Sequence, residues 1–148
     1  MTTVRPLAAT DRESWQALYA GYNTFYKHEL DAPRAELVWS WLLDPGHEEF
    51  GLVAEDDANT IVGIAHLREF PRPGAGERGL YLDDLFTDPT ARGRGVATAL
   101  LEATREVAKQ RGIHVVRWIT ADDNRTAQSV YNKVATRTAW VTYDMDVD

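Results

Sequence analysis

The sequence contains no cysteine, which excludes disulfide bonds, thiolate metal sites and cysteine nucleophiles. It also has no apolar run approaching the ~20 residues of a membrane-spanning helix, and residues 1–7 lack the apolar stretch of a secretory signal. The four histidines are scattered and match no metal-ligand spacing, so we expect no metal site. These absences predict a cytoplasmic protein without a membrane partner.

Basic side chains are the scarcer charged type. The chain has 16 lysines and arginines against 23 aspartates and glutamates, a formal net charge of −7. This balance argues against a nucleic-acid partner and favours attraction of cationic partners. The 148 residues show no internal repeat, low-complexity tract or linker, and they suffice to bury most of their apolar surface. We therefore expect one domain over residues 1–148.

A glycine-containing turn is the most informative stretch. An apolar run over residues 80–86 leads to residues 92–97, Arg-Gly-Arg-Gly-Val-Ala, which open an amphipathic helical pattern. Glycine lets the backbone approach a ligand closely, and a helix start offers unpaired N–H groups and a partial positive charge. The stretch predicts a pyrophosphate seat, although the six residues alone also fit a structural turn. A P-loop would need lysine after Gly95, and a dinucleotide fold would need glycine or alanine in place of Thr98.

These residues resemble the Gln/Arg-x-x-Gly-x-Gly/Ala signature of the GCN5-related N-acetyltransferase (GNAT) superfamily. The resemblance implies an enzyme that uses acetyl-CoA and holds its pyrophosphate at this turn. It assigns acetyl-CoA binding to Leu85, Phe86, Thr87, Arg92, Gly93, Arg94, Gly95, Val96, Ala97, Thr98, Asn124, Ala127 and Tyr131.

A second element follows about thirty residues later. Residues 124–133 resemble the Asn-x-x-Ala-x-x-x-Tyr helix of the superfamily, whose tyrosine reaches the sulfur of the cofactor. Asn124 suits the helix N-cap, and one face carries Ala127, Val130, Tyr131 and Val134. The resemblance implies that Tyr131 is catalytic, whereas its position alone also fits a core aromatic. Val134-Ala135 replaces the usual glycine-aromatic pair, so we expect the helix to end by another route, near Thr136.

Two acids interrupt the apolar strand, and we expect Asp83 and Asp84 to be catalytic and to contact the substrate. Adjacent residues of a regular strand point to opposite faces, so either one acid faces solvent or a β-bulge turns both to the cleft. Residues 81–86 resemble the Tyr-Leu-Glu-Asp-Leu/Phe-Phe segment of spermidine/spermine and related polyamine or thialysine acetyltransferases. This resemblance implies that Asp83 is the base and that Asp84 helps to bind polyamine.

An aromatic stripe marks the first predicted helix and contains Trp15, Leu18, Tyr19, Tyr22, Phe25 and Tyr26. Its pattern resembles polyamine- and histone-type members, which implies that Tyr22 and Tyr26 contact substrate, while the inner residues fit the core.

We interpret the chain as an enzyme that transfers acetyl from acetyl-CoA to a primary amine of a small cationic acceptor, a polyamine or similar. A protein lysine or N-terminal amine, or a non-catalytic acyl-CoA-binding role, remain alternatives.

The predicted elements follow the order β-α-α-β-β-β-α-β-α-β, which is the order of the superfamily. The expected fold class is α/β (α+β), the GNAT fold, with a mixed, mostly antiparallel central sheet flanked by helices. Strands are predicted over residues 3–7, 50–55, 60–70, 79–87, 113–120 and 138–145. Trp140 and Tyr143 on the last strand predict a homodimer formed through terminal strands. Residues 140 and 143 point to opposite faces of a regular strand, so either side chain also fits the domain's own core.

Overall fold

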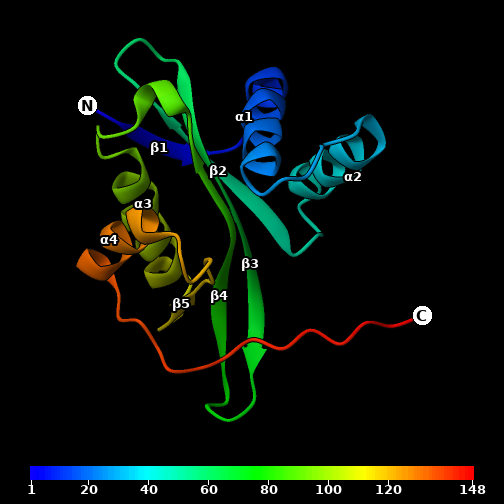
Figure 1. Ribbon diagram of the computed structural model, residues 1–148, viewed down its shortest axis with the longest axis vertical. Coiled ribbons are helices and arrows are strands. Elements are labelled where there is room, and N and C mark those ends of the chain that lie inside the picture. The colour runs from blue at the N-terminus through cyan, green and yellow to red at the C-terminus, as the bar shows by residue number, and fades with distance from the viewer.

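The computed structural model describes residues 1–148 and contains one five-stranded sheet with helices on both faces (Figure 1). The strands are β1 (Thr3–Pro6), β2 (Glu49–Glu55), β3 (Ile61–Arg72), β4 (Glu77–Thr87) and β5 (Val116–Arg117). The helices are α1 (Arg12–Phe25), α2 (Ala32–Leu43), α3 (Val96–Gln110) and α4 (Arg125–Val134), with short 3-10 turns at Ala9–Asp11 and Pro89–Ala91. None of the helices combines the length and apolarity that crossing a membrane requires.

The sheet is mixed, as predicted. Its strands lie side by side in chain order, with antiparallel pairing from β1 to β4 and parallel pairing between β4 and β5. Helices α1 and α2 cover one face, and α3 and α4 cover the other (Figure 1). The sheet is therefore the only layer that both helix pairs share.

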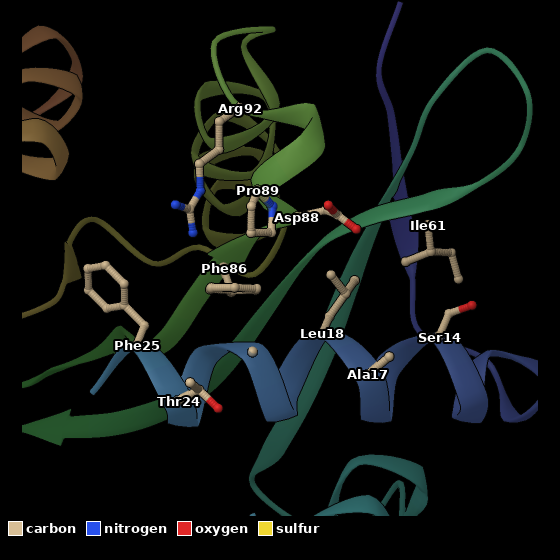
Figure 2. Close-up of a pocket in the computed structure, with 11 residues that line it drawn as sticks. Ser14, Ala17, Leu18, Thr24, Phe25, Ile61, Phe86, Asp88, Pro89 and Arg92 are labelled. Atoms are coloured by element: carbon tan, nitrogen blue, oxygen red, sulfur yellow. The ribbon is translucent and has the colours of Figure 1, made fainter. Parts of the chain in front are cut away.

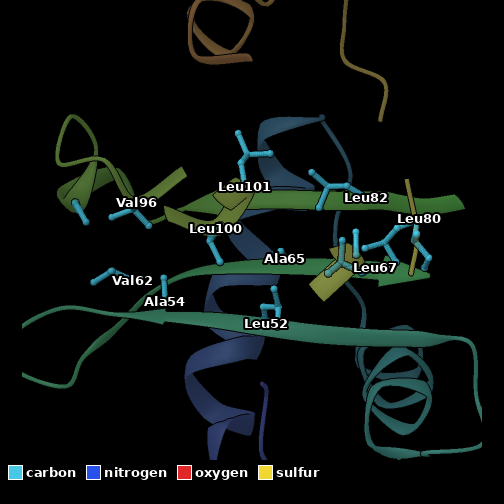
Figure 3. Close-up of a cluster of buried hydrophobic side chains, with 13 residues drawn as sticks. Leu52, Ala54, Val62, Ala65, Leu67, Leu80, Leu82, Val96, Leu100 and Leu101 are labelled. Carbon is cyan, nitrogen blue, oxygen red and sulfur yellow. The ribbon is translucent and has the colours of Figure 1, made fainter. Parts of the chain in front are cut away.

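Each face of the sheet has its own hydrophobic cluster. A cluster of 13 buried residues joins β2, β3 and β4 to α3, with Leu100 and Leu101 packed over Ala65 and Leu82 (Figure 3). A second cluster of eight residues joins the opposite face to α1 and α2 around Trp15, which is fully buried. Alternation along β3 separates the two clusters, because successive side chains of a strand point to opposite faces.

Strand β4 carries one extra residue opposite β3. His66 pairs with Asp84 and Leu67 pairs with Leu82, so Asp83 is left without a partner. Such a β-bulge interrupts the alternation of side chains between the two faces of the sheet, so that adjacent residues can lie on the same face. Asp84 then contacts His66, and Asp83 contacts Arg68, which lies two residues further along the same face of β3. The bulge alternative is confirmed, and both acids lie on the face covered by α1.

Strands β4 and β5 stay together for only two residue pairs, Leu80 with Val116 and Tyr81 with Arg117. The predicted strand over residues 113–120 is therefore present but much shorter than expected. Beyond Tyr81, the edge of β4 that faces β5 has no strand beside it. Within residues 82–87, the backbone N–H and C=O groups that point away from β3 therefore have no strand partner and can bind an extended ligand.

The prediction of a final strand over residues 138–145 is wrong, because residues 136–148 contain neither helix nor strand. Trp140 is 86% exposed and Tyr143 is 90% exposed, so these side chains do not enter the core of the chain either. A strand needs a neighbour to pair with, and the two-residue β5 supplies almost no edge.

Helix α4 ends at Val134, and Ala135 is extended at φ −147°, which explains why no glycine is needed there.

Candidate functional site

Asp84 lies at the centre of a polar cluster on the α1 face. Its carboxylate is 2.8 Å from Nδ1 of His66, and the hydroxyl groups of Tyr22 and Tyr19 are its next polar neighbours. Burial favours a raised pKa, but the interaction with His66, followed by those with the Tyr22 and Tyr19 hydroxyl groups, holds the pKa of Asp84 below its usual range. Asp84 is therefore an ionised carboxylate at neutral pH that has no lysine or arginine side chain bound to it.

Tyr19 and Tyr22 of α1, with Tyr26 just after its last residue, form a row beside Asp84. The ring centroids of Tyr19 and Tyr22 are 5.6 Å apart, and those of Tyr22 and Tyr26 are 4.9 Å apart. Burial, followed by the charge of Asp84, raises the pKa of all three tyrosines. All three thus remain neutral hydrogen-bond donors. Of the two predicted substrate residues, Tyr22 lies beside this carboxylate and Tyr26 packs on Tyr22.

Asp83 has different neighbours from Asp84. Nε of Arg68 lies 3.0 and 3.2 Å from its two carboxylate oxygens. Glu49 of β2 shares a hydrogen bond with the same group. Burial, that hydrogen bond, and the charges of Asp83 and Asp84 raise the pKa of Glu49 to about 9. At neutral pH, Glu49 is protonated and donates to Asp83, so Asp83 is already engaged by two neighbours.

Tyr131 lies on α4, whose first turn is capped by Asn124 through a 3.3 Å bond from the N–H of Ala127 to the Asn124 side-chain oxygen. Its ring packs edge to face against Trp118, with centroids 5.3 Å apart. Burial, and then the charge of Tyr26, raises the pKa of Tyr131 to about 12. No hydrogen bond or ring contact joins Tyr131 to Tyr26, Asp83 or Asp84, and Tyr131 packs against the hydrophobic cluster under α3.

The start of α3 is open to ligand. Its N-cap is Gly95 at φ +80°, and no side chain caps its first turn. The start of α2, by contrast, is capped by Asp31. A Cβ built on Gly93 or Gly95 would meet no atom within 4 Å. The first N–H groups of α3, near Ala97 and Thr98, therefore face free space with the positive end of the helix dipole. This arrangement fits the predicted pyrophosphate seat.

Other predicted cofactor residues have mixed surroundings. The side chain of Phe86 belongs to the α1 cluster, and that of Leu85 packs against the opposite one, so both could reach a ligand mainly through the backbone edge of β4. Arg92 reaches into a groove between α1 and the β4–α3 connection, where its guanidinium lies 5.5 Å from the ring of Phe86 and above Phe25 (Figure 2).

Sequence reasoning missed Glu49 and Arg68. A histidine within the otherwise apolar residues 61–67 was a signal for a buried polar contact, since such groups need partners. Glu49 gave no such signal, because its place beside Asp83 depends on the pairing of three strands.

The protonated state of Glu49 predicts a specific dependence of stability on pH. A carboxyl whose pKa is raised on folding stabilises the protein fully below its unfolded pKa, and that contribution is lost as the pH rises towards about 9. We expect the wild-type free energy of unfolding to fall more between pH 5 and pH 9 than that of Glu49→Gln. Urea unfolding at both pH values measures this, with the exposed neighbour Glu48→Gln as control. Equal slopes in all three proteins would contradict the assignment.

Comparison with known proteins agrees with this geometry. The model of the acetyltransferase (GNAT) family matches residues 15–135. The D-amino-acid N-acetyltransferase HPA3 of Saccharomyces cerevisiae is 30% identical over 141 residues, which cover 95% of this chain and 88% of that protein. The uncharacterized N-acetyltransferase YhfO of Bacillus subtilis is 30% identical over 146 residues, 97% of each chain.

Solved structures give the same result for the fold. The crystal structure of a probable acetyltransferase superposes with a TM-score of 0.87 at 20% identity and covers 99% of this chain and 98% of that one. The predicted GNAT fold is confirmed. The family match covers most of the chain and includes β4, the glycine turn and α4. This chain is an enzyme that belongs to the acetyltransferase (GNAT) family.

Proposed function

We propose that this chain transfers the acetyl group of acetyl-CoA directly to a primary amine of a small cationic acceptor, a polyamine or similar compound. The observation that carries the proposal is Asp84, an ionised carboxylate without a lysine or arginine partner, set beside a row of neutral tyrosines. A cationic amine supplies the missing charge. Tyr131 and the open start of α3 lie on the α3 side of the sheet and Asp84 lies on the α1 side, so donor and acceptor meet across the free edge of β4 that separates them.

Acetyl-CoA binding is proposed for the α3 start and its surroundings. The N–H groups of residues 93–98 take the pyrophosphate, with Arg92 and Arg94 adding positive charge. The free edge of β4 at residues 85–87 pairs with the extended arm of the cofactor. Asn124 and Ala127 act by fixing the first turn of α4, and this cap orients Tyr131.

Deprotonation of the amine sets the main energetic demand. A lysine-like amine has a pKa near 10.4, so its neutral form costs about 4 kcal/mol near pH 7.4. We assign Asp84 the role of holding the ammonium and relaying its proton to water. Asp83 is less suited to that role, because Arg68 and Glu49 already occupy it. The amine nitrogen then bonds to the acetyl carbon as the bond from that carbon to sulfur breaks.

We assign Tyr131 the role of hydrogen-bond donor to the leaving sulfur. With a pKa of about 12 for Tyr131 and about 8.5 for a thiol, full proton transfer is uphill by roughly 5 kcal/mol. Hydrogen-bond donation to the sulfur avoids that cost, and the thiolate then takes its proton from solvent.

An amino acid is the second candidate acceptor. Only Nε of Arg68 bonds to Asp83, and the guanidinium lies 4.5 Å from the ring of Tyr81. Its terminal nitrogens are available for a carboxylate, which guanidinium groups bind in a bidentate manner. The name of the relative HPA3, a D-amino-acid N-acetyltransferase, also favours this candidate.

We further propose a homodimer that pairs through the C-terminal segments. Residues 141, 143, 145 and 147 are apolar and alternate with aspartates at 144, 146 and 148, a pattern typical of a half-buried strand. In the single chain this segment is exposed and unpaired. A second copy supplies the strand partner that the short β5 does not.

The dimer is tested by light scattering at micromolar concentration. We expect the full chain to have the mass of two copies and a chain truncated after residue 136 to have the mass of one. A monomeric full-length protein would rule the dimer out.

The pyrophosphate seat is tested with two matched glycine substitutions. Gly95 and Gly112 lie at opposite ends of α3, both have positive φ, and neither has an atom within 4 Å of a built Cβ. Gly95→Ala and Gly112→Ala therefore carry similar backbone strain, about 1–2 kcal/mol. We expect only Gly95→Ala to weaken acetyl-CoA binding in calorimetry, by at least about tenfold, because its methyl group enters the seat. Equal affinities of the two variants would refute the seat.

Tyr131 is tested by removing its hydroxyl. Tyr131→Phe retains the ring that packs on Trp118, so we expect acetyl-CoA affinity to be kept while turnover falls by roughly 10²–10⁴. Pre-steady-state measurement of the chemical step decides this. A chemical step as fast as in the wild type would make Tyr131 a core aromatic only.

The acceptor class is tested with a matched pair of compounds. Cadaverine and lysine differ only by a carboxylate, so we compare kcat/KM for cadaverine with that for L- and D-lysine. We expect cadaverine to be preferred by at least about tenfold, worth 1.4 kcal/mol, and Asp84→Asn to reduce both activities. A preference for lysine that Arg68→Lys abolishes would establish the amino-acid candidate instead. Turnover confined to basic peptides would favour the protein-amine alternative.

A further inference from the structure

His66 is a buried polar residue that the proposed reaction leaves without a role. Its side chain is 1% exposed, yet both ring nitrogens have partners. Nε1 of Trp15 donates a hydrogen bond to Nε2 of His66 at 2.9 Å, and Nδ1 of His66 lies 2.8 Å from Oδ2 of Asp84. A continuous chain of contacts thus connects α1, through β3, to the carboxylate on β4.

The indole nitrogen settles which tautomer of His66 is present. An indole N–H can only donate, so Nε2 of His66 must present its lone pair to Trp15. The proton of the neutral ring then sits on Nδ1 and points to Asp84. A second proton on Nε2 would place two N–H groups face to face where no water can separate them. Trp15 therefore holds His66 as a neutral donor to Asp84.

The carboxylate of Asp84 has a limited number of acceptor positions, about four in all. His66 occupies one of them at 2.8 Å, and the hydroxyl groups of Tyr22 and Tyr19 lie beside the carboxylate. With its orientation fixed by His66, Asp84 keeps an acceptor position for an incoming N–H group. The side chain retains 17% exposure, so this position is reachable from the cleft.

We propose that His66 is a positioning residue for Asp84, and that Trp15 selects the His66 tautomer that makes this possible. The inference rests on the proposed role of Asp84 towards the acceptor amine. His66 does not touch the substrate and acts only through the carboxylate. Its neutral N–H stabilises the ionised form of Asp84 and directs the remaining acceptor position to the cleft.

The direction of the expected pH effect follows from the surroundings of Asp84. The charged and titratable groups that face it or its immediate partners are Tyr19 and Tyr22 on α1, Tyr26 just after α1, Glu49 on β2, His66 and Arg68 on β3, and Asp83 on β4. Loss of the bond from His66 removes a donor that favours the carboxylate, which raises the pKa of Asp84. The acidic limb of the pH–rate profile must then move to higher pH.

Two substitutions separate the two nitrogens of His66. Asparagine places an amide near the position of Nδ1 and keeps a donor for Asp84, whereas glutamine places one near Nε2 and keeps a partner for Trp15. We expect His66→Gln to shift the acidic limb of kcat/KM upward by about one to two pH units, the effect of losing a hydrogen bond to a charged group. We expect His66→Asn to leave the limb in place and both variants to retain acetyl-CoA affinity. A limb that stays in place in His66→Gln, or moves equally in both, would overturn the inference.

A second measurement does not depend on turnover or on folding of the His66 variants. Nitrogen-15 NMR of the wild-type imidazole reports the tautomer directly, and we expect protonated Nδ1 with bare Nε2. Trp15→Phe should lose this single tautomer, whereas Trp39→Phe, in the same cluster and packed on Trp15, should keep it. A proton on Nε2 in the wild type would overturn the inference. Absence of turnover with every acceptor, together with the expected tautomer, would instead reject the proposed function alone.

Discussion

The unpaired residue in β4 is the constraint on which the site depends. In a regular strand, Asp83 and Asp84 would point to opposite faces, and one of them would enter the cluster under α3. The bulge places both on the α1 face, beside His66 and Arg68. It also lets β4 keep apolar side chains on the other face before and after the acids. One extra residue thus gives the strand a polar site without removing a side chain from the core.

The three carboxyl groups of this site have different neighbours. His66 and the tyrosine hydroxyl groups favour the ionised form of Asp84, Arg68 bonds to Asp83, and burial beside the other two acids keeps Glu49 protonated. Environments that push like groups apart in pKa are how proteins assign separate roles to them. The acidic cluster therefore carries far less negative charge than its composition indicates, and the free charge is concentrated on Asp84.

The limits of sequence prediction in this chain follow from the range of the interactions involved. Helix α3 and strand β4 were predicted closely because glycine, proline and apolar alternation act locally. The bulge itself left a local trace, since Leu82 and Leu85 face the same cluster at odd spacing. The length of β5 and the state of residues 136–148 depend on edges built by distant segments, and so does the meeting of Glu49 with Asp83. Local patterns contain no information about such pairings, which explains both the wrong final strand and the missed glutamate.

The two separate hydrophobic clusters have an evolutionary consequence. The proposed acceptor residues are anchored in the cluster of α1 and α2, whereas the proposed cofactor residues, apart from Phe86, are anchored mainly on the side of α3 and α4. Substitutions in one cluster rarely disturb packing in the other, because side chains at distant, unconnected sites contribute almost independently to stability. Selection can therefore remodel α1 and α2 for a new amine while leaving the donor half intact. A fold divided in this way can diverge in what it acetylates without having to evolve again how it holds the acetyl group.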